Sequence, residues 1–363
     1  NYISMSNLSF CLELKVNTKI LSKDEKEIIV DGFKRAYGLG VSENFILIPD
    51  FETGLIYQVN LKNKKTKILF RDKNKLKYLN FLNRFKINKI GKDIVQPHDI
   101  VVDKNSNIFI SEMGPGRGTG KGKITLFDKN LKLVEEIGIK MHEDYGLISP
   151  VMISKNKDKF YVSEYGAHKI LRFSYDFKFL DWIGKKGEID KKIENNSWDL
   201  SKQFINVDLN SPHAIKIGPN NNFYIADTDN HRILRYSNSG EFKGWIGKNQ
   251  NGEINSNWNI NGKAVKGEEL GAFNKPIDLV IYENFLYVSE IDNSRVVKIA
   301  LDGKNHGVLS LDKTNLIYHW SINQKKKIHL TNPYGLKIKD NVFYIADRGN
   351  HRIKIIYSSN LFK

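Results

Sequence analysis

One sequence pattern recurs along this chain and restricts the folds that it can adopt. Each copy starts at a turn that often contains proline, continues into a short apolar strand, and then gives an aromatic-rich strand that ends in Ser or Ala followed by an acid. The clearest copies are NSPHAIKIGPNNNFYIADTDNHRILRY from Asn210 and TNPYGLKIKDNVFYIADRGNHRIKII from Thr331. Further copies start at Gln96, Ser149 and Lys275, and a degenerate one at Ala36. No copy can bury an apolar face alone, so the pattern predicts a stack of six similar units.

The acid that ends the second strand marks the register of each copy. These acids are Asp50, Glu112, Glu164, Asp227, Glu290 and Asp347. Four copies place a basic residue five positions later: Lys169, Arg232, Arg295 and Arg352. We expect the acids to cap turns or to pair with these basic residues, and so to be structural. Glu164 is the one acid that we also assign to ligand binding.

The strand pattern predicts an all-β fold, a six-bladed β-propeller in which residues 1–363 form one domain. Each copy supplies three strands, and segments such as FLDWIG and FKGWIG supply a fourth. We expect the blades at 36–70, 97–138, 150–184, 212–247, 276–311 and 333–363. The last copy ends one strand short. Residues 8–20 alternate apolar and polar side chains, so we expect this N-terminal strand to complete the last blade and close the ring.

The stretches IADTDNHRIL and IADRGNHRIK resemble the NHL repeat, and the resemblance extends from about Ala36 to Tyr357. It implies a six-bladed propeller of four-stranded antiparallel blades, in agreement with the strand pattern. His231 and His351 belong to the repeated Asn-His-Arg-Ile turn, and we expect both to be structural.

Composition limits the classes of function. With 40% hydrophobic residues the chain can form a packed core, and no apolar run reaches the roughly 18 residues of a membrane-spanning helix. The single cysteine, Cys11, excludes an intrachain disulfide. The net charge of +16 would suit nucleic acid, but the excess is mostly lysine accompanied by many Asn and Ile residues, a bias typical of A+T-rich genomes. Nucleic acid is therefore a partner that we do not favour.

The sequence leaves the location of the protein open. Nothing in the first twenty residues resembles a signal peptide, and the chain starts at Asn1 rather than Met. We expect a soluble protein, either cytoplasmic or periplasmic or secreted, whose native N-terminus is missing from this sequence.

Long insertions and the start of each first strand are expected on one face of the propeller. The insertions are 71–95, 185–209, 248–273, 312–330 and the hairpin Gly114–Gly122. The position after the repeat's proline reads Tyr37, His98, Val151, His213, Ile277 and Tyr334 around the ring. Because loops of this length usually bind something, we expect a ligand at this mouth of the channel. The assigned ligand-binding residues are Tyr37, Glu164, Tyr334 and Arg117.

Two histidines in the same register suggest a metal. Neutral imidazole is a good ligand for divalent ions, so His98 and His213 are predicted to bind one, with zinc the first choice and calcium the second. No nucleotide cofactor is expected, because Pro115 and Arg117 break the glycine pattern of a phosphate-binding loop.

Pro-His at this position resembles the peptidyl-α-hydroxyglycine α-amidating lyases, a group with NHL propellers. In that group three such histidines hold a zinc ion, and a tyrosine and arginines act on the substrate. The resemblance implies His98 and His213 as metal ligands and Tyr165 as the catalytic tyrosine. Tyr334 stands where the third histidine would be, and Thr228 replaces one arginine. A metal site would then be completed by Tyr334, Glu164 or water.

Two hypotheses of function follow. The first is a propeller that binds a small or peptide-like ligand at the channel mouth, through a divalent metal and with lyase or hydrolase chemistry. The alternative is a non-enzymatic platform that binds a protein or single-stranded RNA through its basic loops.

Overall fold

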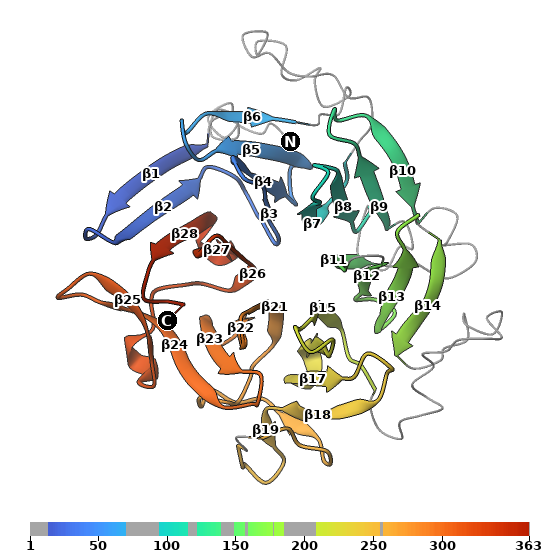
Figure 1. Ribbon diagram of the computed structural model, residues 1–363, viewed down its shortest axis with the longest axis vertical. Coiled ribbons are helices and arrows are strands. Elements are labelled where there is room, and N and C mark those ends of the chain that lie inside the picture. The colour runs from blue at the N-terminus through green and yellow to red at the C-terminus, as the bar shows by residue number, and fades with distance from the viewer. Residues whose placement is uncertain are drawn as a thin grey trace, which may run out of the picture.

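The computed structural model of the protein describes residues 14–69, 94–114, 122–138, 149–156, 159–176, 178–184, 208–254 and 257–362. Over these ranges the strands form six antiparallel blades in a ring around a central axis (Figure 1). The predicted all-β six-bladed propeller is confirmed. The helical segments of the described ranges are three single turns of 3-10 helix: η6 (Thr228–Asn230), η7 (Gln324–Lys326) and η8 (Arg348–Asn350). None of the helices described is long and apolar enough to cross a membrane.

The first three blades each contain four strands, counted from the axis outward. Blade one contains β3 (Gly40–Val41), β4 (Phe45–Asp50), β5 (Leu55–Asn60) and β6 (Thr66–Ile68). Blade two contains β7 (Pro97–Val102), β8 (Ile108–Glu112), β9 (Lys123–Phe127) and β10 (Leu133–Ile137). Blade three contains β11 (Pro150–Lys155), β12 (Lys159–Glu164), β13 (Lys169–Ser174) and β14 (Phe179–Gly184).

The other three blades carry additions. Blade four contains β15 (Pro212–Ile217), β16 (Phe223–Asp227), β17 (Arg232–Tyr236) and β18 (Phe242–Ile246), followed by a ribbon of β19 (Lys248–Asn249) and β20 (Ala264–Val265). Blade five contains β21 (Pro276–Tyr282), β22 (Phe285–Glu290), β23 (Arg295–Ala300), β24 (Asn305–Asp312) and β25 (Ile317–Ser321). Blade six contains β26 (Pro333–Lys339), β27 (Val342–Asp347), β28 (Arg352–Ser358), β2 (Glu25–Asp31) and β1 (Lys15–Ile20).

An N-terminal segment closes the ring, but it differs from the segment that the sequence pattern predicted. β2 pairs antiparallel with β28 and is the fourth strand of blade six. The described part of the expected strand, β1, pairs with β2 as a fifth and largely exposed strand. Residues 8–13 lie outside the described residues. Ile28 and Val30 of β2 are buried, and they pack with blades six and one in a shared apolar cluster. This burial explains why β2 rather than β1 adjoins the blade.

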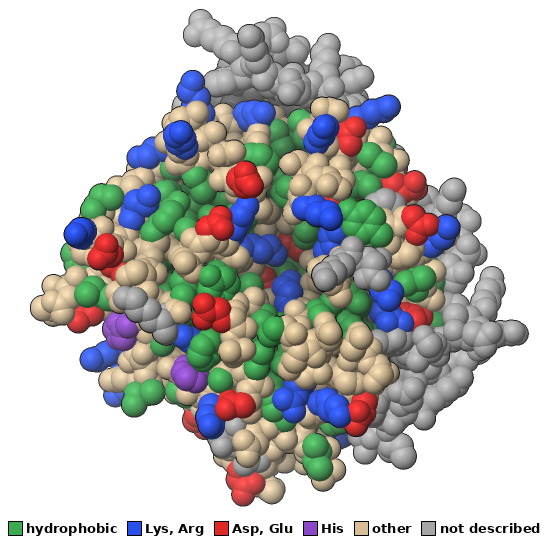
Figure 2. All heavy atoms as spheres, in the orientation of Figure 1, with side chains coloured by type: hydrophobic (Ala, Val, Ile, Leu, Met, Phe, Trp, Pro, Cys, Tyr) green, Lys and Arg blue, Asp and Glu red, His purple; other side chains and the backbone are tan. Residues whose placement is uncertain are grey.

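Apolar clusters between neighbouring blades form the core. The inner strands are buried on both faces, because each blade packs on two others. Trp182 and Trp245 on the outer strands of blades three and four are also buried, in the clusters toward the adjoining blades. The repeated Trp-Ile-Gly is therefore part of the packing. Figure 2 shows one face of the ring, on which Lys and Arg side chains gather around the central hollow.

Two glycines let the innermost strands approach one another closely. The Gly335 amide donates to the Tyr37 carbonyl at 2.8 Å, and the Gly38 amide donates to the His98 carbonyl at 2.9 Å. A Cβ atom on Gly335 would lie 2.7 Å from the Tyr37 oxygen and 2.9 Å from Gly38 Cα. Blades six, one and two are thus joined by backbone hydrogen bonds where no side chain fits.

Replacing Gly335 by alanine should lower the free energy of unfolding by about 1–3 kcal/mol, because backbone rather than a side-chain tip must move. The control is Gly40→Ala, whose Cβ would meet methyl groups of Val102 and Ile100 at 3.2 and 3.3 Å and should cost less. Urea unfolding followed by tryptophan fluorescence measures both. Equal losses of unfolding free energy in the two variants would show that the backbone contact between Gly335 and Tyr37 is not tight.

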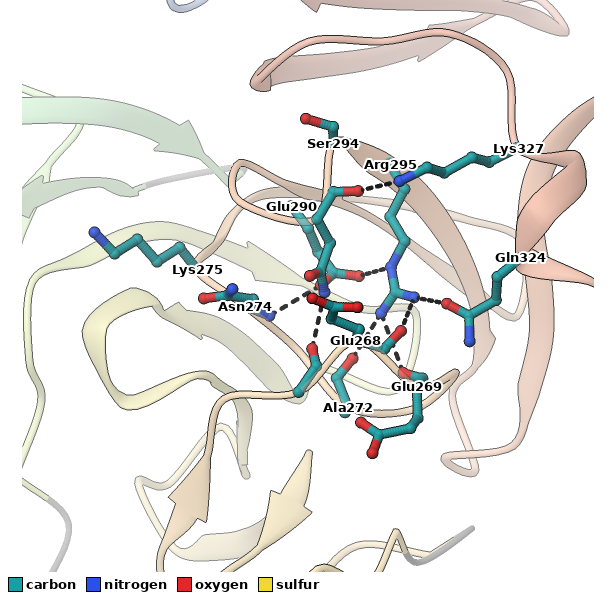
Figure 3. Close-up of polar contacts among 12 residues, drawn as sticks. Glu268, Glu269, Ala272, Asn274, Lys275, Glu290, Ser294, Arg295, Gln324 and Lys327 are labelled. Atoms are coloured by element: carbon teal, nitrogen blue, oxygen red, sulfur yellow. Dashed lines mark hydrogen bonds and ion pairs between the residues drawn. The ribbon is translucent and has the colours of Figure 1, made fainter.

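Arg295 fastens the insertion after blade four onto blade five (Figure 3). Its guanidinium donates to the Glu290 carboxylate at 2.5 Å and to the Gln324 side chain. It also donates to three carbonyls of the insertion, those of Glu268, Glu269 and Ala272, at 2.5, 3.2 and 2.9 Å. One buried side chain therefore ties a loop, a strand and the η7 turn together.

Candidate functional site

The six repeat acids are structural, as predicted. All have an exposed fraction of 0%. Each carboxylate accepts a backbone N–H from the turn that enters its own blade: Asp50 from Lys34 and Arg35, Glu112 from Val95, Glu164 from Ser149, Asp227 from Asn210, Glu290 from Asn274, and Asp347 from Thr331. Burial raises the pKa of Asp50 and of Asp227, and these N–H donors oppose that rise. Glu164, which we had assigned to ligand binding, holds the same turn-capping position.

A residue four positions after the acid links each of four blades to the next. His168, His231, Ser294 and His351 occupy this position, with φ of 55°, 54°, 48° and 53°. Nδ1 of His168 accepts the Ser211 amide at 2.9 Å, and Nδ1 of His231 accepts the Lys275 amide at 3.2 Å. His351 donates to the Lys34 carbonyl. His231 and His351 are therefore structural, as the repeated turn predicted.

Two rings of side chains meet at the axis, on the face where the acids lie. The first ring is the position after the repeat's proline: Tyr37, His98, Val151, His213, Ile277 and Tyr334. The second ring is the residue after the acid: Phe51, Met113, Tyr165, Thr228, Ile291 and Arg348. Except for Phe51, these residues line a cavity of about 130 Å³, together with Asp229 and Lys275. We call this cavity the cup.

His98 is held in one tautomer. Its Nδ1 lies 3.0 Å from the Val151 carbonyl oxygen, which can only accept, so Nδ1 carries the proton. Nε2 of the neutral ring is then an acceptor, and the Tyr334 hydroxyl donates to it at 3.2 Å. The ring stacks on Tyr37 with centroids 4.4 Å apart. The His98 ring is thus fixed in the lining of the cup, with Nε2 accepting from Tyr334.

His213 is held in the same tautomer by different partners. Its Nδ1 lies 3.0 Å from the Ser211 carbonyl and 3.0 Å from Thr228 Oγ1. The Thr228 hydroxyl donates its own proton to the Pro276 carbonyl at 2.6 Å, so it accepts from His213. Nε2 of His213 therefore carries the lone pair. The ring meets Tyr165 edge to face at 5.0 Å between centroids.

Arg348 contributes positive charge to the cup, and sequence analysis did not select it. Its guanidinium lies 5.0 Å from the Tyr37 ring centroid and 5.9 Å from that of Tyr334. Among the described residues its buried Nε has no hydrogen-bond partner. The signal was its position, since Arg348 follows Asp347 as Tyr165 follows Glu164. Applying that register to every blade would have found it.

Among the described residues the cup offers zinc two histidines, so the metal stays a prediction. Zinc sites use three or four protein ligands. The described residues contain no group of three His, Cys, Asp or Glu side chains that could hold a metal ion. The His98 and His213 ring centroids are 6.3 Å apart, whereas two imidazoles on one tetrahedral zinc would bring them to about 5 Å. The Tyr334 hydroxyl also stands beside the His98 nitrogen that a metal would need.

The structure brings together five of the seven residues that the sequence assigned to a site. Tyr37, His98, Tyr165, His213 and Tyr334 all line the cup. Glu164 is absent from its lining, because its carboxylate caps the turn at Ser149. Arg117 lies outside the described residues.

Comparison with known proteins agrees with the repeat and the fold. The family model described as NHL repeat matches residues 209–236. The NHL repeat-containing protein 2 of Gallus gallus is 28% identical over an alignment of 154 residues, and the match covers 38% of this chain. The matched region spans only 19% of the length of that protein.

Solved structures with this fold carry several functional names. A streptogramin B lyase is 12% identical with a TM-score of 0.52, covering 94% of this chain and 97% of its own. A gluconolactonase from Xanthomonas campestris is 11% identical with a TM-score of 0.54, covering 91% and 89%. An auxiliary nutrient binding protein from Bacteroides ovatus is 13% identical with a TM-score of 0.54, covering 98% and 74%. At these identities the likeness concerns the fold alone.

Proposed function

We propose that this NHL-repeat β-propeller binds the polar end of a small molecule, or of a peptide-like chain, in the cup. The observation that carries the proposal is the fixed orientation of His98 and His213, whose Nδ1 atoms are both committed to carbonyl acceptors. Nε2 of His213 and the Tyr334 hydroxyl, which itself donates to Nε2 of His98, then supply the polar groups of one small cavity. Locking rotamers and tautomers in advance is how binding sites reduce the cost of ordering on association.

The walls of the cup restrict what it accepts. Val151, Ile277, Met113 and Ile291 supply apolar wall between the polar groups. Arg348 adds a guanidinium, which suits a carboxylate or another planar anion. At about 130 Å³ the cup is smaller than the 300–1,000 Å³ of drug-sized sites, so it suits one functional group of a larger ligand. The ligand we propose has a hydrogen-bond donor beside an anionic group and a short apolar part.

The same geometry supports a reaction as the second part of the proposal. A neutral imidazole whose Nε2 bears the lone pair is a general base, and Tyr165 packs against His213. Lyase or hydrolase names occur among proteins of this fold. In this proposal His213 takes a proton from the bound molecule, and Thr228 and the Ser211 carbonyl hold its ring through Nδ1.

Histidine tautomers give a test that needs no ligand. In ¹⁵N spectra of histidine-labelled protein at pH 8, we expect His98 and His213 to be protonated at Nδ1 and unprotonated at Nε2, assigned by His98→Gln and His213→Gln. Thr228→Val removes one acceptor of the His213 proton and should perturb the His213 signals alone. The Nε2–H tautomer for both rings would contradict the proposed acceptor geometry.

Ligand binding is tested with short carboxylic and hydroxy acids, lactones and N-acetylated dipeptides as probes, by thermal shift and calorimetry. We expect the best probe to bind about tenfold more weakly to Tyr334→Phe and Arg348→Gln, the cost of one lost hydrogen bond or ion pair. His306→Gln is the control, since His306 lies on the outer strand β24, away from the cup, where its ring packs on Phe285. A probe whose affinity is the same in all variants binds elsewhere.

Two further measurements separate the competing readings. In titrations with zinc and calcium we expect no stoichiometric binding to the cup. Stoichiometric binding that His98→Gln and His213→Gln abolish would show that a metal, rather than the side chains directly, contacts the ligand. Salt-sensitive association with RNA or a protein, unchanged by all cup variants, would favour the platform on the basic loops.

A further inference from the structure

A second cavity opens at the other end of the central channel. Its volume is about 530 Å³, within the range of small-molecule sites. It is lined by the C-terminal ends of the innermost strands β3, β7, β11, β15, β21 and β26 and by residues that follow them. We call it the basal chamber. Figure 2 shows its face, with blue side chains surrounding the hollow at the centre of the ring.

Among the described residues, the charged ones that line the basal chamber are all lysines. They are Lys155, Lys216, Lys337 and Lys339. Lys155 pairs with Asp103 at 3.0 Å. Lys216 donates to Ser154 Oγ at 3.0 Å and lies 3.6 Å from Asp278. Within the described part of the chain, Lys337 and Lys339 have no hydrogen bond or ion pair through their side chains.

Two carboxylates lie behind the lysines and keep Lys337 charged. Asp99 and Asp278 are fully buried next to the axis. Burial acts to lower the pKa of Lys337, and attraction to Asp99 and Asp278 outweighs it, so this pKa is raised. Burial, with repulsion from Lys337 adding to it, lowers the pKa of Lys216. The two ammonium groups therefore repel each other across the chamber.

The buried carboxylates cannot fully neutralise these lysines. Asp278 accepts the amides of Leu279 and Leu336, both at 2.8 Å, so its charge is shared with backbone donors. Asp99 Oδ2 accepts the Ile153 amide at 3.1 Å, while Oδ1 faces Gly38 and has no partner among the described residues. Burial raises the pKa of Asp99, which weakens its value as a counter-ion. An anion entering from the open side would contact Lys337 directly and relieve its repulsion with Lys216.

We propose that the basal chamber binds a small polyvalent oxyanion, a phosphate or clustered carboxylates on an organic molecule, between Lys216 and Lys337. Lysine binds such groups as a mobile point charge, and a site within the ring loses less of that attraction to solvent than one on the surface. Ile100, Val280 and Ile338 also line the chamber and would contact the organic part of the molecule. The chamber and the cup share no lining residue, and they lie at opposite ends of the channel.

Calorimetry and thermal shift at constant ionic strength test the proposal, with inorganic phosphate, glucose 6-phosphate and citrate as probes and chloride as the reference ion. We expect at least one probe to bind, and to bind about tenfold more weakly to Lys337→Gln. Lys104→Gln is the matched control, because it removes the same charge from an exposed turn outside the chamber lining. The affinity of the Lys104→Gln variant for the probe should differ from that of the wild type by less than about twofold, because exposed charges are screened by solvent and salt.

Further variants distinguish loss of the binding site from loss of the fold. If Lys337→Gln does not fold, Lys339→Gln removes a second lysine of the chamber and should also weaken binding. Lys337→Arg keeps the charge and should retain most of it. Tyr334→Phe in the cup should leave the affinity for the probe unchanged. Equal affinities in wild type, Lys337→Gln and Lys104→Gln, or no binding of any probe beyond that of chloride, would overturn the proposal.

Discussion

Deletion of residues 1–31 should leave the protein unable to form a stable ring, whereas deletion of residues 1–20 should leave the ring closed. The longer deletion removes β2, which pairs with β28 along its whole length. It also removes Ile28 and Val30, with exposures of 3% and 0%. Burial of each such side chain contributes about 1.5–3 kcal/mol, and the loss would also leave β28 as an open edge.

The shorter deletion has a smaller expected cost. β1 is mostly exposed, so among the described residues of this segment the main loss is Leu14, which is buried, at about 2–5 kcal/mol. Size-exclusion chromatography and urea unfolding compare the two truncations. Single substitutions in the undeleted chain make the same comparison. Val30→Asp disrupts the buried face of β2, and Thr18→Asp is the control because Thr18 is exposed. Indistinguishable behaviour of both pairs would show that β2 does not close the ring.

Replacing Arg295 by methionine should cost about 3–5 kcal/mol of unfolding free energy, because it leaves the Glu290 carboxylate buried without its partner. The matched control is Arg352→Met. That arginine makes the equivalent pair with Asp347 at 2.7 Å, but its side chain is 26% exposed against 2% for Arg295. Water can therefore partly replace the Arg352 guanidinium beside Asp347, and the loss of unfolding free energy should be clearly smaller than for Arg295→Met. Chemical unfolding of both variants decides the comparison.

The pH dependence of the Arg295→Met variant gives a second readout. Burial raises the pKa of Glu290, and Arg295 is the first of the groups that limit this rise. Without Arg295 the folded-state pKa of Glu290 should rise further above that of the unfolded chain. The folded state then binds the extra proton, so stability lost at pH 8 should partly return as the pH falls toward 5. Glu290→Gln in the same chain should remove this pH dependence. A flat difference between variant and wild type over this range would contradict the argument.

The repeat made the fold predictable, because its acid and turn recur in every blade and leave few arrangements possible. The closing strand was predicted in the wrong place for a physical reason. Glu25 of β2 is only 2% exposed, and it accepts hydrogen bonds from Ser358 Oγ at 2.7 Å and Asn360 at 3.0 Å. A glutamate buried by partners from the other end of the chain breaks the apolar alternation. Residues 8–20 alternate more regularly, so local pattern favoured them.

The residues of the candidate site that share one position of the repeat could be predicted from the sequence. Tyr37, His98, His213 and Tyr334 share one position of the repeat, and this position faces the cup. A metal between the histidines could not be judged from spacing, since it depends on where Tyr334 Oη lies. Arg348 was missed because its position in the repeat was considered in only two blades. The basal chamber was missed because Lys216 and Lys337 look like ordinary outward-facing strand lysines.

Ring closure through β2 has a consequence for how the chain reaches its folded state. The first strand of the closing pair precedes the strands of all six repeats along the chain, and its partner β28 follows all the others. The bond between Ser358 and Glu25 joins residues 333 positions apart. Until the last blade emerges from the ribosome, β2 has no partner and its apolar side chains stay in water. Contacts of such long range form slowly because they carry the full entropy of loop closure. The nascent chain therefore passes through an open arc with two unpaired edges, the stage at which it is most exposed to aggregation and to chaperones.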